Sequence, residues 1–489
     1  MRKTISITVA VAVAAALTAC AVGPDYQKPT VQTAPTFVEA EPAVYSTDDS
    51  VGPFWGQFND DLLDGLVIEA LAANHDLRIA LAHLQQARAL RTQSKLDLLP
   101  TVTANGGYTD QRYPAAQTFG TGSSLDERYY NAGFDATWEL DLFGRVRRGV
   151  EASRAVVEGQ EATLRDVQVS VTAEVARTYF ELRGEQAELA VLQRNAANQQ
   201  QTVDLTNSLL DAGRGTELDT ARAKAQLDTT LATIPPLRAS VQKSIHRLGV
   251  LTGREPDALA TILAAPGSLP ELPRMPAVGD PAGLLRRRPD IRVAERRLAA
   301  STAQIGVAVG DLFPKVTFTG NFGFAAGDLN ALGSAGTKTF LIGPSISWAA
   351  FDLGRVKARI AGARAGADAD LAAYQQTVLK ALEETENALV AHARQRDRLV
   401  QLTAAARESD TAAQIARARY EGGLVGFLDV LDAERAQLSA QDQLAQSRTD
   451  AATSLIAVYK ALGGGWQGAP LPVTPWPVAR ITTTPPPRR

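Results

Sequence analysis

The chain has 489 residues, of which 45% are hydrophobic and 21% charged, and its formal net charge is −3 at pH 7. This charge provides no basic field of the kind that nucleic-acid binding needs, so we exclude nucleic acid as a partner. The single cysteine excludes a disulfide framework or a cysteine metal site within one chain, and an aromatic content of 6% favours long, solvated helices over a compact enzyme core.

The first 19 residues are predicted to be a signal peptide, because Arg2 and Lys3 precede an apolar run that is too short to span a bilayer comfortably as a helix. The run ends in Leu-Thr-Ala-Cys at 17 to 20, which resembles a bacterial lipobox. We therefore expect cleavage to leave Cys20 as a lipid-modified N-terminus, while an ordinary signal peptide with an incidental cysteine is the alternative. Residues 20–59 are predicted to be a lipid-anchored, extended tether, since they are rich in Pro, Thr and acidic residues without a sustained period.

Residues 60–270 are predicted to form a first structural repeat. Helical periodicity runs from Asp60 to Leu99, with a cap at Asn59 or Asp60. Two alternating segments, about 101–109 and 130–141, predict strands, and the polar stretch 110–128 between them predicts a loop.

The first repeat ends in a predicted helical hairpin over about 145–252, which turns at Gly213 and Gly215. The pair Pro235 and Pro236 is expected to kink or break its return helix. A free-standing coiled-coil rod would explain such Ala-rich helices, but it would not explain the strands.

The second half of the chain repeats this layout. The 34 residues from Asp76 recur in the same pattern from Asp290, an offset of 214, and Trp138 matches Trp348 at an offset of 210. A period this long excludes a short-repeat solenoid and predicts two tandem copies of one structural unit. The second repeat is expected over 271–465, with strands at about 315–325 and 339–351 and a hairpin over about 354–462, followed by a Pro-rich tail at 466–489.

Each predicted strand has about 10 residues, which is enough to cross a bilayer when tilted. A soluble antiparallel sheet with one wet face would alternate in the same way, but here the aromatic residues gather toward the strand ends, as in an interfacial girdle. Four strands cannot close a barrel, which needs about eight. Other copies of the chain must supply the rest, and a barrel from three copies suits a conduit better than one from two.

No catalytic constellation is recognisable in the sequence. The four histidines, His75, His83, His246 and His392, have no metal-like spacing, and the common zinc, phosphate-binding and nucleophile motifs are missing. We therefore expect no enzyme activity, no cofactor and no metal.

One charged stripe follows the second glycine turn. Leu428, Asp432 and Arg435 stand at i, i+4 and i+7 and share one face of a helix. In a threefold tube this stripe could form a leucine constriction beside a ring of carboxylates, whereas the alternative is an ordinary surface pair of Asp432 and Arg435. Asp219 and Asp429 could equally be helix-capping residues.

These segments together resemble the TolC-type outer membrane factors, and among them the lipoprotein branch of drug-efflux (RND-type) outer membrane channel components. The matching segments are LTAC at 17–20 followed by AVGPDYQKP, NHDLRIA at 74–80, LLRRRPDIRVAERRLA at 284–299, DLFPKV at 311–316, FDLGRV at 351–356 and FLDVLDAER at 427–435. They cover nearly the whole chain after the signal.

The resemblance implies a mixed α and β fold, in which a homotrimer forms a twelve-stranded outer-membrane β-barrel of four strands per chain, continued by a long periplasmic α-helical barrel. It implies an outer-membrane exit duct, anchored by a palmitate-type lipid in the outer-membrane lipid, that passively conducts drugs from an inner-membrane efflux pump through a periplasmic adaptor protein. The outer-membrane channel of a protein-secretion exporter and a lipid-anchored periplasmic coiled-coil scaffold are the alternatives.

The resemblance also implies two groups of site residues. A periplasmic gate falls on Tyr420, Leu428, Asp432 and Arg435. The first turn, AGRGTELD, departs from GGLVGFLD in the second, so that Arg214 and Glu217 give the two hairpin tips different charge. The tips expected to contact the adaptor are Gly213, Arg214, Gly215, Gly422, Gly423, Leu424 and Gly426.

Overall fold

The computed structural model describes residues 21–48, 53–114 and 125–467. It divides into two units, the first made of Met1–Thr30, His83–Glu161 and Arg292–Gln376 and the second of Val31–Ala82, Ala162–Ile291 and Thr377–Arg489. The predicted signal peptide, Cys20 and nearly all of the Pro-rich tail lie outside the described residues.

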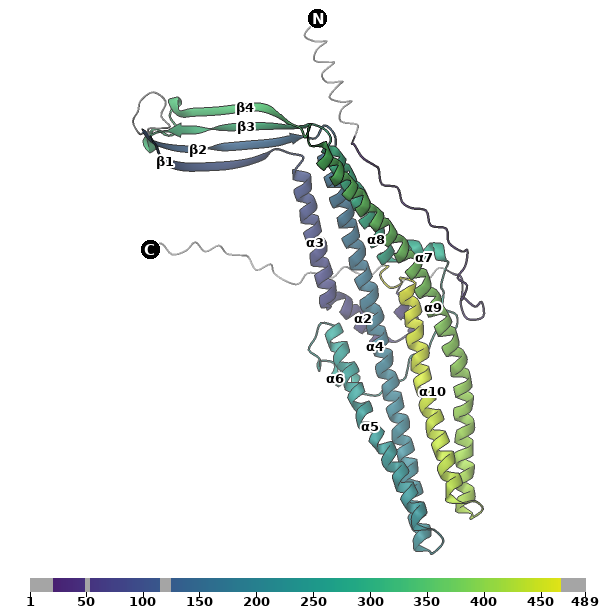
Figure 1. Cartoon of the computed structure of the whole chain (residues 1–489). Helices are drawn as coiled ribbons and strands as arrows, with labels where there is room; N and C mark the ends of the chain where they lie inside the picture. Colours follow the sequence, from purple (N-terminus) through teal and green to yellow (C-terminus); the bar gives the residue numbers. More distant parts are fainter. Residues whose placement is uncertain (1–20, 49–52, 115–124, 468–489) are drawn as a thin grey trace. The chain divides into compact units, whose positions relative to one another are not determined.

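The first unit contains one antiparallel sheet in the order β1-β2-β3-β4 (Figure 1). The strands are β1 (Thr101–Tyr113), β2 (Leu125–Leu140), β3 (Lys315–Ala326) and β4 (Lys338–Ser347). The pairing of β2 with β3 joins the two sequence repeats, with Trp138 opposite Phe318. Pro344, which cannot donate to a ladder, lies on β4 at the edge of the sheet.

The loop predicted over 110–128 is shorter than expected, because pairing continues from Asp110 opposite Arg128 to Tyr113 opposite Leu125. An ion pair of 3.0 Å joins Arg128 to Asp110 across the strands, and such cross-strand pairs stabilise a sheet whatever the polarity of its residues. At the other end of the sheet, β4 stops at Ser347, four residues before the predicted end at Phe351.

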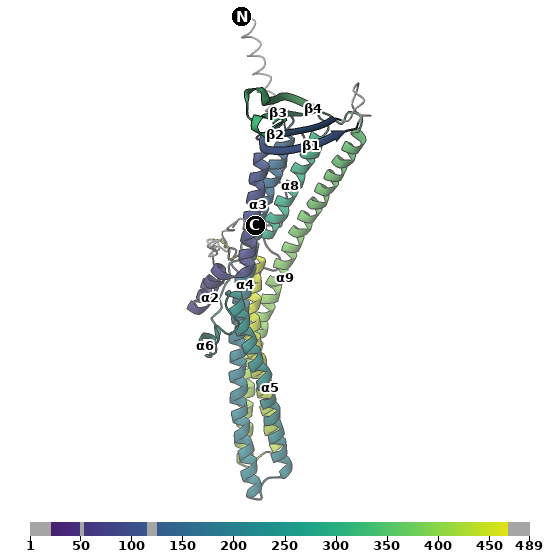
Figure 2. The ribbon, with the colours of Figure 1, turned by 90° about the vertical axis from the view of Figure 1, so that its left-hand side faces the viewer.

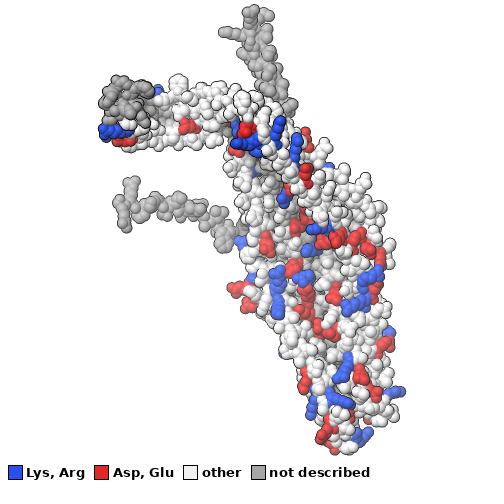
Figure 3. Space-filling model, in the orientation of Figure 1, with Lys and Arg blue, Asp and Glu red and all other residues white. Residues whose placement is uncertain are grey.

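The two faces of the sheet differ in chemistry. On one face, Asp135 of β2 accepts hydrogen bonds from Asn105 of β1 and, at 2.7 Å, from Asn321 of β3. The opposite face carries large apolar side chains that stay exposed in the single chain: Val102, Phe134, Trp138, Phe318, Phe322, Phe340 and Ile342. Figure 3 shows few charged side chains along the middle of the sheet and clusters at its two ends. A sheet with this pattern has one face suited to lipid and one suited to water.

Helices α3 (His75–Leu96), α4 (Arg145–Asp211), α8 (Pro289–Gly310) and α9 (Leu353–Glu421) have residues in both units. The helix predicted from Asp60 to Leu99 is interrupted at Asn74, which separates α2 (Asp61–Ala73) from α3. The side chain of Asn74 accepts hydrogen bonds from the backbone of Asp76 and Leu77, so this residue starts a new helix. None of the described helices is both long and apolar enough to cross a membrane.

The second unit holds two helical hairpins, α4 with α5 (Glu217–Leu251) and α9 with α10 (Phe427–Ala461), which lie side by side (Figures 1 and 2). The turns place Gly213 and Gly423 in the left-handed region, at φ 68° and 71°, which favours glycine. Of the kink or break predicted for the return helix at Pro235 and Pro236, the break is wrong, because α5 continues through both, and the kink stays a prediction. Buried side chains on either side of the prolines, such as Ile234 and Val241, hold this helix in its packing.

The core of the second unit lies where the short elements η1 (Phe54–Phe58), α2, α6 (Ala260–Leu263) and α7 (Pro281–Arg287) accompany the hairpins. Phe54 stacks on Tyr459 at 5.0 Å between ring centroids, and Phe58 meets Phe180 edge to face at 4.9 Å. The extended tether predicted over 20–59 is therefore wrong for this part: η1 is folded, and Phe37 and Tyr45 are buried. Apolar residues within a polar stretch carry no period, so the sequence did not show this packing.

Candidate functional site

Both hairpin tips are closed by backbone hydrogen bonds. At the first tip, Arg214 N donates to Leu209 O at 2.8 Å, and at the second, Leu424 N donates to Arg419 O at the same distance. The N-cap of α5 is Thr216, whose hydroxyl oxygen accepts from the backbone N–H of Asp219. The cap of α10 is Gly426, without a side-chain cap. Neither Asp219 nor Asp429 is therefore the N-cap residue that the sequence allowed.

The structure places the predicted stripe on one exposed face of α10, with Leu428 52% exposed. Arg435 does not pair with Asp432. Its Nε donates to Oε1 of Gln226 on α5 at 2.8 Å, and among the described residues Asp432 has no ion-pair partner. The simple surface pair is thus absent, while the stripe keeps an unpaired carboxylate and ties one hairpin to the other.

Tyr420, at the end of α9, lies apart from this stripe and is half-buried against Phe427, with 5.6 Å between ring centroids. Burial raises the pKa of its hydroxyl, and the negative charge of Asp219 adds to this effect. Tyr420 also packs against an apolar cluster in which Val203 and Leu227 of the first hairpin meet Phe427 of the second, so the two tips are in contact.

A buried ion pair lies beside the stripe, and sequence reasoning missed it. Arg417 of α9 donates to Glu434 of α10 at 2.6 Å, and the hydroxyl of Thr202 on α4 donates to the same carboxylate oxygen at 2.7 Å. The Glu434 side chain is only 5% exposed. A glutamate next to Arg435 suggests a solvated helix face, but Glu434 shares the buried side of α10 with Val430 and Gln437, which is the signal that could have found it.

Further polar contacts lie along the same side of α10. Asn195 of α4 donates to Gln441 of α10 at 2.8 Å and joins the two hairpins, whereas Gln437 donates to Asp410 of α9 at 2.6 Å within the second hairpin. A cavity of about 350 Å³ between α4, α5 and α10 contains two facing carboxyls, Glu188 and Asp442. Burial raises the pKa of Glu188 to about 7, with a further contribution from the charge of Asp442.

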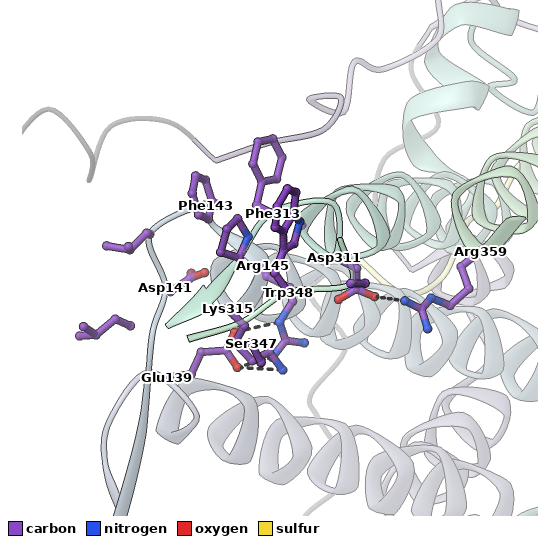
Figure 4. Close-up of a pocket in the computed structure, with 15 residues that line it drawn as sticks. Glu139, Asp141, Phe143, Arg145, Asp311, Phe313, Lys315, Ser347, Trp348 and Arg359 are labelled. Carbon is purple, nitrogen blue, oxygen red and sulfur yellow. Dashed lines mark hydrogen bonds and ion pairs between the residues drawn. The ribbon is translucent and has the colours of Figure 1, made fainter. Parts of the chain in front are cut away.

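In the first unit, a second cavity of about 260 Å³ lies where the strands meet the helices (Figure 4). Glu139, near the end of β2, accepts two hydrogen bonds from Arg145 at 2.9 and 2.6 Å. Phe143 and Phe313 stack at 4.6 Å between ring centroids. The cavity is thus lined by both charged and aromatic side chains.

The N-terminal arm is held next to this cavity. Arg148, at the start of α4, is buried and donates to the carbonyl oxygens of Val22 and Gly23 and, at 2.7 Å, to Asp25. The backbone of Val22 donates to Phe143 O at 3.0 Å. The chain is therefore held at Val22, Gly23 and Asp25, shortly after the predicted lipidation site.

The histidines form no metal centre in the described part of the chain, where no cluster of three or more potential ligands occurs. His392 is buried beside Ser454, with its Nδ1 at 3.1 Å from the hydroxyl oxygen. Burial lowers the pKa of this imidazole to about 4, so it is neutral at neutral pH and serves packing.

Comparison with known proteins decides the family. A family model described as outer membrane efflux protein matches residues 66–254 and 281–464. The chain belongs to this family. Outer membrane protein OprJ of Pseudomonas aeruginosa is 31% identical over 95% of this chain and 97% of its own length. The solved outer-membrane channel OprN is 45% identical and superposes with a TM-score of 0.87, over 92% of this chain and 100% of that chain.

Other relatives agree. The efflux pump outer membrane protein TtgC of Pseudomonas putida is 31% identical over 91% of this chain and 93% of its own length. The MtrE channel of Neisseria gonorrhoeae, solved in an open state, is 29% identical over 92% of this chain and 99% of that one, with a TM-score of 0.77.

These findings confirm the family and the fold class predicted from the sequence. The fold is that of the TolC-type outer membrane factors, in which three chains share a twelve-stranded barrel that continues as a helical barrel. The four-stranded sheet and the two hairpins are the share of one chain. The chain is thus an outer-membrane exit duct of an efflux system, as the sequence predicted.

Proposed function

We propose that the chain works as a homotrimeric, passive duct that conducts small molecules such as drugs from an inner-membrane pump and a periplasmic adaptor to the exterior, and that it catalyses no reaction. The two-faced sheet carries this proposal, because an exposed apolar face opposite a polar one suits a lipid-embedded wall around a wet lumen. Relatives of the chain include antibiotic, toluene and solvent efflux pump outer membrane proteins, which supports a cargo of small organic molecules.

The second part of the proposal is a lipid anchor at Cys20. The Leu-Thr-Ala-Cys sequence supports it, and so does the clamp of Arg148 on Val22 and Gly23, which holds the chain that directly follows the predicted anchor. We propose that the anchor keeps the duct in the outer-membrane lipid while the helical hairpins extend into the periplasm.

The third part is a gate at the hairpin tips. In a threefold arrangement, the exposed side chains of Leu428 and Asp432 would form an apolar constriction and a ring of carboxylates that favours cations. Arg435 and Tyr420 act as latches, because Arg435 donates to Gln226 of the first hairpin and Tyr420 packs against the apolar cluster that joins both hairpins. Separation of the hairpins would open the duct in a two-state change, driven by the adaptor's preference for the open form.

The adaptor is proposed to contact the glycine turns. The first turn carries Arg214 and Glu217, whereas the second carries an exposed Leu424, so the two hairpins would offer an adaptor different chemistry. The proposed contact residues are Gly213, Arg214, Gly215, Gly422, Gly423, Leu424 and Gly426.

Single-channel recording in planar bilayers tests the duct and the gate together. Small openings of the wild-type trimer should grow in the double variant Asp432→Ala, Arg435→Ala. The exposed pair on α9 provides a matched control, Arg407→Ala with Glu408→Ala, which should leave the conductance unchanged. Unchanged conductance in an assembled gate variant would count against the gate, and no conductance from any folded trimer would count against the duct.

A further inference from the structure

The end of the sheet at which β2 leads into α4 and β4 leads into α9 is called its foot. In both repeats the foot carries a tryptophan of the kind found at membrane surfaces. Trp138 of β2 donates its ring N–H to Leu98 O, and Trp348, just after β4, donates to Leu312 O, both at 2.9 Å. The duplication thus preserves an individual hydrogen bond at each junction of helix and strand. Tryptophans with an apolar ring and a satisfied N–H are typical of the boundary between hydrocarbon and headgroups.

The N-terminal arm marks the same level independently. A Cβ at Gly144 would lie 2.6 Å from the Cα of Ala21, so the arm touches the turn between β2 and α4. The chain that follows the proposed anchor residue is thus held near the end of β2, which carries Trp138.

The cavity at this foot has cations whose bonding capacity is only partly used (Figure 4). Arg145 is held by two short bonds to Glu139, but the Lys315 amine lies 3.5 Å from that carboxylate and is 43% exposed. Arg359 lies 3.2 Å from Asp311 and is 53% exposed. An ammonium has three donors and a guanidinium five, so both groups can take a further acceptor.

The charges that line the cavity balance. Its carboxylates are Glu139, Asp141 and Asp311, and its cations are Arg145, Lys315 and Arg359. A balanced site matches a zwitterionic headgroup, which brings one phosphate and one amine. The stacked rings of Phe143 and Phe313 add an apolar wall next to these charges.

We propose that this cavity binds the headgroup of a membrane phospholipid, with Lys315 and Arg359 holding its phosphate and the Phe143–Phe313 stack packing against its glycerol and upper acyl chains. Charge-assisted bonds from two cations orient a phosphate in a site that water only partly reaches. The carboxylates beside them attract an amine, so the site favours phosphatidylethanolamine. The bound lipid seals the junction between barrel and helices and depends on neither the gate nor the anchor.

Native mass spectrometry of the purified full-length trimer tests this site. Phosphatidylethanolamine should stay bound at collision energies that remove detergent, and Lys315→Gln with Arg359→Gln should lower its retention about fivefold or more, as expected when charge-assisted bonds are lost. Lys315→Arg with Arg359→Lys keeps the charges and should keep the lipid. Arg112→Gln with Arg128→Gln removes two exposed cations at the opposite end of the strands and should change nothing.

Two further probes separate the source of the phosphate. Diacylglycerol, which lacks a phosphate, should not be retained, and inorganic phosphate should not displace the lipid at equal concentration. Equal retention of phosphatidylethanolamine by wild type and the Gln variant, or competition by inorganic phosphate as strong as by the lipid, would overturn the proposal. All variants must remain trimeric in the same spectra, and their channel conductance reports separately on the duct.

Discussion

In the second unit, the base of the two hairpins, around η1, and their tips are held together by different contacts. Around η1 the contacts are aromatic and apolar, with Phe54, Phe58 and Phe180 packed about the buried ring of Tyr459. Toward the tips, the hairpins also meet through an apolar cluster, which includes Val203, Leu227 and Phe427, but a buried polar contact from Thr202 to Glu434 is added to it. Apolar packing resists separation in proportion to buried area, whereas a polar contact can exchange its partner for water. We therefore expect a fixed base and more separable tips.

Truncation in the aromatic cluster should have the largest effect. Phe180→Ala removes a fully buried ring and should lower the free energy of unfolding by about 3 to 5 kcal/mol, because a cavity is left behind. Thermal unfolding of the detergent-solubilised protein measures this loss. Val38→Ala, at an exposed position, is the control, and an equal effect of both variants would contradict the fixed base.

Removal of one partner of the buried ion pair should come next. Arg417→Ala leaves the Glu434 carboxylate buried with only Thr202, and should cost about 2 to 3 kcal/mol, since an uncompensated charge remains. Hydrogen exchange should speed up near the tip of α10 and remain unchanged around Tyr459.

The double variant Arg417→Met, Glu434→Leu is the matched control for this pair. It removes both charges and keeps the volume, so it should recover much of the lost stability. Uniformly faster exchange along α10 in Arg417→Ala would contradict the idea that the tips separate independently of the base.

The facing carboxyls Glu188 and Asp442 should make the contact between hairpins depend on pH. The pKa of Glu188 is raised to about 7 from an ordinary value of 4.5, so the folded state holds a proton that the unfolded state has lost. Stability from this group is therefore present below about pH 4.5 and is lost as pH rises toward 7.

Glu188→Gln should remove this fall in stability. The fall amounts to about 1 kcal/mol of unfolding free energy, because solvent screening reduces the effect of a half-buried group. The measurement is the unfolding midpoint of wild type and variant between pH 4 and about 8. Glu217→Gln, at the exposed first tip, should keep the wild-type profile. A Glu188→Gln profile parallel to the wild type would exclude this carboxyl pair as a pH-sensitive contact.

Exposed charges on the hairpins should matter least. Arg407 and Glu408 pair at 2.8 Å, but their side chains are largely exposed. Arg407→Ala should change the free energy of unfolding by less than about 0.5 kcal/mol. Water stabilises each of these exposed charges about as well as the ion pair does. If Arg407→Ala lowered the free energy of unfolding as much as Arg417→Ala, burial would not explain the difference between the two ion pairs.

Much of the fold was predictable because its signals are local. The alternation around Trp138 and Trp348 predicts strands, and the glycines at 213 and 423 predict reversals that the backbone needs a left-handed residue to make. The features missed by sequence reasoning depend on partners far away in the chain. Phe37 and Tyr45 are buried by Leu389 and Val458, and Glu434 is paired by Arg417 across a hairpin.

The sequence by itself determined the duplication, the family, the four strands, the two hairpins and the stripe of Leu428, Asp432 and Arg435. These follow from periodicity, turn residues and motifs, each of which acts over a few residues. Only the tertiary structure decided that Arg435 binds Gln226 rather than Asp432, that Glu434 is buried, and that Lys315 and Arg359 share one cavity with Phe143. The physical reason is that burial and pairing depend on which distant segments come together, and local patterns carry no record of that.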